Sequence, residues 1–121
     1  ACLDARMREV YTAAYARGSG EWREVVPPAV LAPAEVLRAH AVGDGDWFGA
    51  GNGFAAYPAL GGELGLARVA AGAHPTAQSI GELALPRLVA GEGVAASAAL
   101  PLYVRHRVAL TAAEQGAGAR L

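Results

Sequence analysis

The sequence predicts a mixed α/β domain that opens with antiparallel strands and continues with alternating helices and short strands. Three observations support this prediction: polar and apolar residues alternate early in the chain, apolar residues recur at helical spacing later, and glycine or proline separates the segments. The chain has 121 residues, of which 54% are hydrophobic and 7% aromatic. This length suits one domain with a modest core of Leu, Val, Tyr and Trp.

The first thirty residues predict three strands. Residues 2–16 alternate in polarity and indicate a hairpin that turns at Arg8 and Glu9. Arg8 would cost about 1 kcal/mol there if its φ is positive, since such turns favour Gly or Asn. The glycines within residues 18–20 supply the next turn. A third strand over 22–26 then ends at the two prolines that follow, as expected for an edge strand.

The middle of the chain predicts helices on either side of a short strand. Pro33 suits the first turn of a helix that ends near Ala41, and Glu35 complements the helix dipole. Residues 47–50 indicate a short buried strand, which leads through a glycine-rich turn into a brief helix over 54–60 that its proline interrupts.

The last third of the chain predicts the longest helix. Residues 61–73 are glycine-rich, with at most a short strand over 66–69. A helix over 75–90 follows, kinked by Pro86. Its apolar residues recur at helical spacing at Ala77, Ile80, Ala84 and Leu88.

Alternation returns near the end of the chain. Residues 102–109 predict a strand whose two faces carry different side chains. One face carries Leu102, Val104, His106 and Val108, and the other carries Tyr103, Arg105 and Arg107. Residues 111–114 have the spacing of a capping box, so we expect a short terminal helix or frayed tail over 111–121.

Charge and cysteine content exclude several classes of protein. Ten cationic side chains, all of them arginine, and eleven acidic ones give a net charge of −1, so no overall field attracts nucleic acid or anionic membrane. Cys2 is the single cysteine, which excludes an internal disulfide and a thiolate zinc cluster. Uncharged stretches such as 93–104, about twelve residues long, are shorter than the ~20 residues that span a membrane.

No catalytic constellation emerges from the titratable residues. His40, His74 and His106 are too far apart for the known helix-borne metal-ligand spacings, and we expect each on the surface or at a helix cap. Ser79 lacks the first glycine of a nucleophile elbow.

Two segments remain candidates for binding. Gly51, Asn52 and Gly53 follow a predicted strand, where glycines allow a nucleotide to approach the backbone, although a tight turn with positive φ demands the same residues. Tyr103, Arg105 and Arg107 form the second candidate. Fixed guanidinium groups on a strand face can engage carboxylates of a partner or of a part of the same protein that this chain lacks, or simply remain solvated.

Three groups of residues resemble the second half of the TsaB family, also called YeaZ. They are Asp-Ala-Arg-Met-x-Glu-Val-Tyr at 4–11, Gly-Asn-Gly-Phe-x-x-Tyr-Pro at 51–58, and Ala-Leu-Pro-Leu-Tyr-Val-Arg at 99–105 with Thr-Ala-Ala-Glu at 111–114. The sequence departs from the family at Arg8, where Gly is frequent, at Ala32, where a capping Ser or Thr is common, and at His106, where Asp often follows the Arg.

The resemblance implies one lobe of the actin-like, sugar-kinase-like (ASKHA, ribonuclease H-like) ATPase fold. Residues 1–110 would form this C-terminal lobe, and the N-terminal lobe would lie outside the chain. In that family TsaB is a cytoplasmic, non-catalytic subunit that supports synthesis of threonylcarbamoyladenosine beside the tRNA anticodon. It pairs with TsaD, which carries the metal and the transfer reaction, and the ATPase TsaE joins them.

The resemblance also implies which cofactors and partners the protein has and what role each candidate residue plays. The chain would need no cofactor of its own, since ATP and metal belong to the partner subunits, and it would meet tRNA only indirectly and no membrane. Its partners would be TsaD, TsaE, its own N-terminal lobe and, as a homodimer, a second copy. Gly51, Asn52 and Gly53 would form a vestigial nucleotide-side turn. Contacts with the other lobe or with a partner would be made by Asp4, Arg6, Tyr103, Arg105 and Arg107.

The alternative is a glycoprotease-like or nucleotide-dependent enzyme of the same fold. Active ATPases of this fold contact phosphate through glycines of the hairpin that opens the second lobe. Residues 4–7 of this chain instead present side chains and the Asp4 carboxylate, which would repel phosphate. The residues therefore favour a scaffold.

Overall fold

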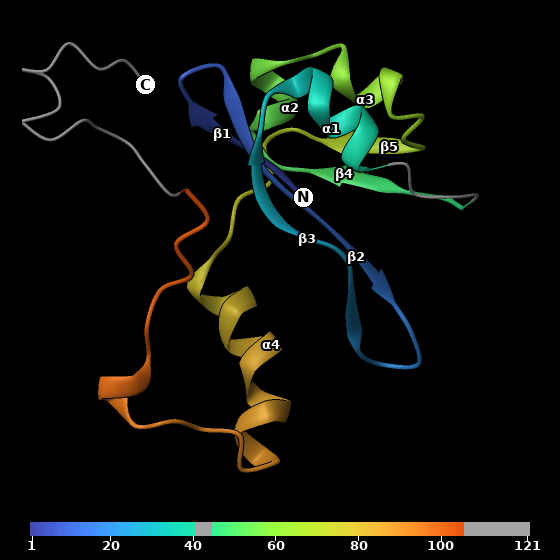
Figure 1. The fold of residues 1–121 in the computed structure, drawn as a ribbon. Helices are drawn as coiled ribbons and strands as arrows, with labels where there is room; N and C mark the ends of the chain where they lie inside the picture. The colour runs from blue at the N-terminus through green and yellow to red at the C-terminus, as the bar shows by residue number, and fades with distance from the viewer. Residues whose placement is uncertain (41–44, 106–121) are drawn as a thin grey trace, which may run out of the picture.

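The computed structural model describes residues 1–40 and 45–105. Two sheets and several helices form a mixed α/β arrangement, as predicted (Figure 1). The antiparallel sheet has the order β1 (Cys2–Arg6), β2 (Glu9–Arg17) and β3 (Trp22–Leu31). The parallel sheet joins β4 (Phe48–Ala50) to β5 (Arg68–Ala70). The helices are α1 (Pro33–Ala39), α2 (Gly53–Ala56), α3 (Leu60–Glu63) and α4 (Ala77–Val89), and Ala96–Ala98 form a 3₁₀ turn.

The β1–β2 hairpin is confirmed, but its turn comes one residue earlier than predicted. Met7 and Arg8 form the turn and Glu9 already belongs to β2. Arg8 does adopt a positive φ, of 62°. The pairing register shifts between Asp4 and Arg6, which places an irregularity beside the turn.

The predicted end of the third strand was wrong. Strand β3 continues through Pro27 and Pro28 to Leu31. Thr12 pairs with Ala29 and Ala14 pairs with Val26, so the two prolines face one residue of β2 across a bulge. Proline lacks the N–H that a regular ladder needs, and a bulge on an outer strand removes that need.

Helix α1 begins as predicted, with Pro33 in its first turn. Ala32 has no side chain to cap the helix, but Glu35 Oε2 accepts a hydrogen bond from the Ala32 backbone N–H at 3.1 Å. Half of a capping box therefore stabilises the helix start. The predicted end near Ala41 lies outside the described residues.

The short elements between residues 47 and 70 follow the predictions in part. Strand β4 forms but is not fully buried, because the Phe48 side chain is 53% exposed. The brief helix predicted over 54–60 is two single turns, α2 and α3, separated near Pro58. Strand β5 pairs with β4 in parallel, Phe48 with Arg68, and lies two residues later than the predicted start at 66, so that it overlaps the predicted strand only in part.

The core is small and lies between the antiparallel sheet and the first helices. It consists of the buried side chains Cys2, Val10, Val36, Phe54 and Leu60. Tryptophan was expected in the core, but Trp22 lies outside it, since it is 55% exposed on β3. The core joins β1 and β2 to α1, α2 and α3 through one apolar cluster.

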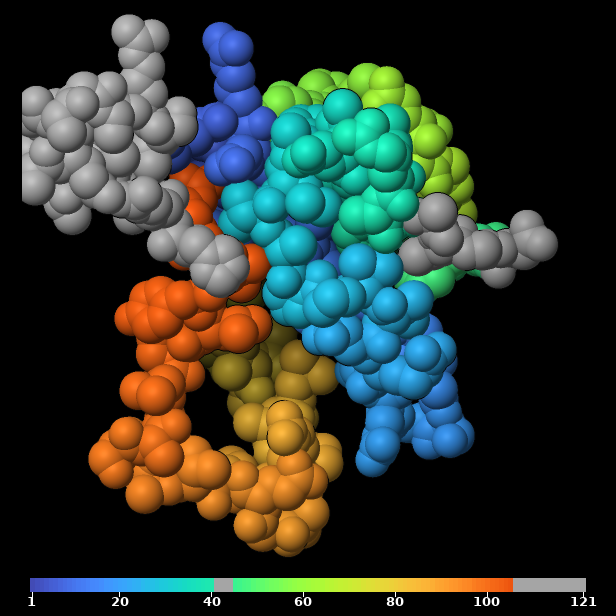
Figure 2. Space-filling model, in the orientation of Figure 1, coloured from blue at the N-terminus to red at the C-terminus, as the bar shows by residue number. Residues whose placement is uncertain are grey.

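Helix α4 forms where predicted, yet it contributes nothing to the core. Thr76 Oγ1 caps it by accepting the Ser79 backbone N–H at 3.1 Å, and Gly91 follows it with a φ of 80°. No residue of α4 is buried, so its apolar face is exposed. In Figure 2, α4 and the 3₁₀ turn after it project away from the sheets, and the end of the described chain returns to β1, where Arg105 contacts Ala5.

The predicted strand over 102–109 is wrong for the residues that the structure describes. Residues 101–105 have no regular secondary structure. Residues 106–109 and the predicted terminal helix over 111–121 lie outside the described residues. No described strand pairs with this segment, and Arg105 contacts the β1–β2 hairpin through its side chain.

Candidate functional site

The fold brings together two of the predicted candidate segments at β1. The backbone N–H of Asp4 donates a hydrogen bond of 2.9 Å to Asn52 Oδ1, across 48 positions of sequence. Asp4 Oδ1 accepts the backbone N–H of Arg6 at 2.9 Å, and Asp4 Oδ2 lies 3.3 Å from an Arg6 guanidinium nitrogen. Asp4 and Arg6 of β1 and the glycine turn at 51–53 therefore form one site.

The glycines of the turn are explained by close packing on β1. A Cβ atom at Gly51 would lie 2.1 Å from the carbonyl oxygen of Cys2, and φ there is 121°. A Cβ atom at Gly53 would lie 2.5 Å from Cys2 Sγ. Both positions need glycine so that α2 can approach β1, which favours the turn geometry over a nucleotide contact.

Arg105 reaches back to the same hairpin from the other end of the described chain. Its Nη2 donates to the Ala5 carbonyl oxygen at 3.0 Å and to Glu9 Oε2 at 2.6 Å. The guanidinium carbon lies 5.9 Å from the centre of the Tyr11 ring. With only 11% of its side chain exposed, Arg105 is committed to the hairpin and is not displayed on an open strand face as predicted.

Of the remaining predicted contact residues, Arg6 and Tyr103 do not take part in these contacts of Arg105. Arg6 projects from the hairpin with 88% of its side chain exposed, and Tyr103 is 80% exposed. Arg107 lies outside the described residues. The predicted grouping of Tyr103 with Arg105 on one strand face does not occur, because no strand forms there.

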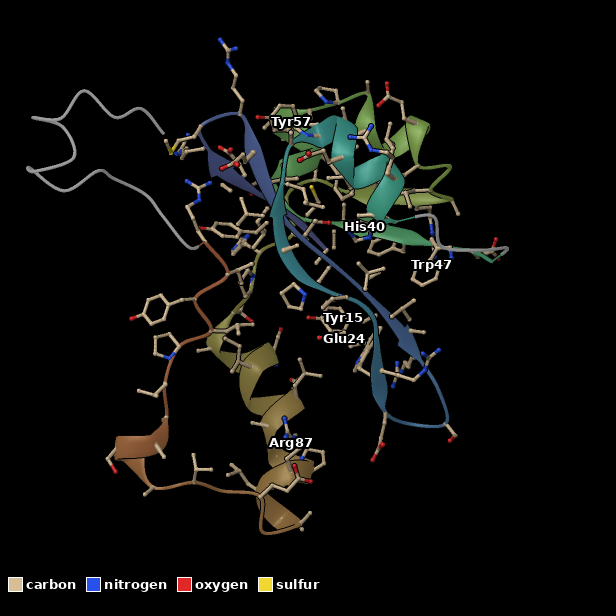
Figure 3. The ribbon with its side chains drawn as sticks, in the orientation of Figure 1. Tyr15, Glu24, His40, Trp47, Tyr57 and Arg87 are labelled. Atoms are coloured by element: carbon tan, nitrogen blue, oxygen red, sulfur yellow. The ribbon has the colours of Figure 1, made fainter. Side chains whose placement is uncertain are left out.

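A separate polar pair fixes α1 on the sheet. Figure 3 labels His40, which ends α1; it is buried, and its Nε2 lies 2.9 Å from Thr12 Oγ1 on β2. Burial lowers the pKa of His40, which keeps the ring neutral. Sequence reasoning placed this histidine on the surface or at a cap; it is a cap residue, but a buried one.

The structure contains two notable cavities. A mainly apolar one of about 240 Å³ lies beside His40 and Phe54, below the roughly 300 Å³ at which ligand pockets begin. A second one, of about 810 Å³, lies between the β2–β3 turn and α4. Among residues 1–40 and 45–105, no three His, Cys, Asp or Glu side chains gather as metal ligands. Burial raises the pKa of the Cys2 thiol, so this residue is a poor nucleophile.

Sequence reasoning missed Glu9 as a functional neighbour of Arg105. The two residues are 96 positions apart, so no local spacing could link them. Glu9 is nevertheless part of the motif at 4–11, which was the available signal. No helix in the described part of the chain is long and apolar enough to cross a membrane.

Comparison with known proteins shows the class of fold and the proteins to which this chain is similar. No protein-family profile matches the chain. YeaZ from Pseudomonas aeruginosa aligns with a TM-score of 0.68 and 36% identity, covering 84% of this chain and 47% of that one. A structure described as an uncharacterized protein with similarity to peptidase YeaZ from the same organism gives the same TM-score and identity, covering 86% and 47%. The chain therefore has the fold of an ASKHA-type lobe.

Within that class, the chain is similar in sequence to TsaB. The tRNA threonylcarbamoyladenosine biosynthesis protein TsaB of Escherichia coli (strain K12) is 38% identical over 111 residues, which are 90% of this chain and 48% of that protein. The predicted resemblance to part of TsaB, or YeaZ, is confirmed. The chain spans about half the length of the relatives that it matches.

Proposed function

We propose that this chain is a non-catalytic interaction lobe that supports TsaD in threonylcarbamoyl transfer to tRNA. The similarity to a protein named for tRNA threonylcarbamoyladenosine biosynthesis supports the pathway. The single observation that favours a scaffold is that charged residues of the motifs at 4–11 and 99–105 brace the lobe: Asp4 bonds to Asn52 and Arg6, and Arg105 bonds to Glu9. Asp4, Glu9 and Arg105 are paired within the lobe and are not free to act on a substrate, whereas the Arg6 side chain is 88% exposed.

The partner set follows from the same proposal. TsaD and TsaE would supply the metal and ATP chemistry, and the chain would meet tRNA only through them in the cytoplasm. An N-terminal lobe of its own protein and a second copy are further proposed partners, and the exposed apolar side chains of α4 offer surface for such contacts.

The enzyme alternative has one specific observation in its favour, the peptidase label carried by a structural relative. A peptidase or nucleotide-dependent enzyme needs a nucleophile, a metal or a phosphate cradle. The described residues contain no gathered metal ligands, and Cys2 occupies the space beside Gly51 and Gly53. These observations support the scaffold over the enzyme.

Calorimetry with ATP and Mg²⁺, followed by an assay for released phosphate, tests the choice between scaffold and enzyme. We expect no turnover by the chain alone, because its glycine turn is filled by β1. Micromolar binding accompanied by turnover would contradict the scaffold.

A second measurement tests the pathway. Cells whose own TsaB has been replaced by the protein carrying this chain should retain threonylcarbamoyladenosine in their tRNA, measured by mass spectrometry. Replacement of Asp4 by Ala should lower that level, since it removes the acceptor of the Arg6 N–H and the carboxylate beside its guanidinium. A level that is lost even with the unaltered sequence would contradict the proposed pathway role.

A further inference from the structure

The tip of the β1–β2 hairpin has an unusual backbone. Arg6, Met7 and Arg8 have φ values of 61°, 53° and 62°, so three successive residues with side chains lie in the left-handed region. Each pays a steric cost that glycine would avoid. Such conformations persist where the surrounding structure fixes them, and they concentrate at functional sites.

One brace holds the tip from the side of β1. Asn52 Oδ1 accepts the Asp4 N–H at 2.9 Å, and Asp4 Oδ1 accepts the Arg6 N–H at 2.9 Å. Asn52 itself stands in the glycine turn that packs on Cys2. The start of the tip is therefore anchored to the core.

A second brace holds the tip from the other side. Arg105 donates through Nη2 to the Ala5 carbonyl oxygen on β1 and to the Glu9 carboxylate on β2, and through Nη1 to Met7 Sδ at 3.1 Å. One guanidinium group thus joins both strands and the turn. Because it is largely buried, its hydrogen bonds are stronger than those of an exposed pair.

The braced tip presents a specific surface. The Arg6 side chain is 88% exposed, Met7 is 60% exposed and Arg8 is exposed. A thioether between two guanidinium groups matches the composition of protein interfaces, where Met and Arg are enriched. Guanidinium groups engage carboxylates through paired hydrogen bonds.

We propose that the tip, defined as Arg6, Met7 and Arg8, docks onto an acidic surface of a partner protein, with Arg105 and Asn52 as positioning residues. This inference rests on the proposed scaffold function and names the part of the lobe that makes the contact. A protein surface is favoured over RNA because the Asp4 carboxylate lies within the same cluster and the chain's net charge is −1.

Charge reversal at the tip is the first test. Binding of the full chain to purified TsaD and to purified TsaE is measured by calorimetry for the wild type, for R6E/R8E and for a control, R23E/R38E, which makes the same charge change at exposed positions elsewhere. We expect at least about a tenfold loss of affinity for one subunit with R6E/R8E, and less than about a twofold loss with the control.

Each outcome separates the tip from the scaffold proposal. If the wild type binds and R6E/R8E binds equally well, the tip assignment is wrong and the scaffold stands. If the wild type binds neither subunit, both proposals are wrong. If R6E/R8E loses binding to tRNA alone, with a steep salt dependence, the partner is a nucleic acid and the acidic protein surface is overturned.

Two further variants separate function from folding. M7N/R8G places residues that favour a two-residue hairpin turn at the tip, so it should raise the Tm while weakening binding; a tip that serves only the fold would gain Tm with binding unchanged. R105K keeps the charge but loses the geometry of the second brace.

R105K should weaken binding by about three- to tenfold. V36A, which destabilises the core at a distance from the tip, should bind with wild-type affinity despite its lower Tm. If R105K and V36A bind alike, Arg105 is a structural residue only.

Discussion

Two regions of this molecule illustrate different relations between sequence and packing. The body, residues 1–40 and 45–72, buries Val10, Val36 and Leu60 almost completely at 0%, 1% and 1% exposure. Helix α4 has good helix-forming residues, a cap and an apolar face, yet it buries no residue. Figure 3 shows the contrast, with Tyr15 and Glu24 on the paired strands and Arg87 on the projecting helix. The local sequence pattern is enough to form a helix, but the helix is buried only where another part of the protein packs against it.

The largest effect that separates the two regions should come from glycine replacement. G51A should destabilise the fold by about 4 kcal/mol or more, since its methyl group would meet the Cys2 carbonyl and φ is positive. G81A in α4 has open space around it and should stabilise the helix by up to about 1 kcal/mol. Urea denaturation measures both. Equal changes in the free energy of unfolding for G51A and G81A would show that the body and α4 do not differ in how tightly they are packed.

Leucine truncation should give the next largest difference. L60A removes a side chain that is 1% exposed and should cost about 3 kcal/mol. L85A removes one that is 60% exposed and should change stability by less than about 0.5 kcal/mol. A large loss with L85A, measured by the same denaturation, would mean that a partner or second copy covers α4 in solution.

Acidification should produce a smaller effect that is confined to the body. Burial lowers the pKa of His40 below its usual 6.5, so the unfolded chain binds this proton before the folded chain does. The contribution is fully present above about pH 6.5 and is lost as the pH falls through the interval between the two pKa values. The Tm at pH 7.5 and 5.5 measures it, and H40Q should flatten the dependence. An unchanged slope in H40Q would show that other groups cause it.

Prediction from sequence succeeded where the signal was local. Alternation gave the β1–β2 hairpin, helical spacing gave α4, and the Pro33 signal gave the start of α1. It failed at Pro27, where a bulge in β3 itself makes proline tolerable, and at residues 102–105, where alternation had no strand to pair with. Strand formation depends on a neighbour that the local sequence does not contain.

The candidate site was likewise predictable only where its residues belong to local motifs. Asp4, Arg6 and the turn at 51–53 could be selected from their motifs. Their meeting through Asn52, and the pairing of Arg105 with Glu9, involve separations of 48 and 96 positions. Spacing arguments cannot reach that far, so the sequence suggested a displayed arginine where the fold uses it as an internal brace.

The sequence by itself determined the helices, the first hairpin, the near-neutral charge and the resemblance to TsaB, because these depend on local propensity, turn chemistry and residue identity. Tertiary structure alone decided which apolar side chains are buried, why Gly51 must be glycine and what Arg105 holds. The reason is physical: burial, close approach and charge pairing are properties of two surfaces in contact, and each half of such a contact comes from a distant part of the chain.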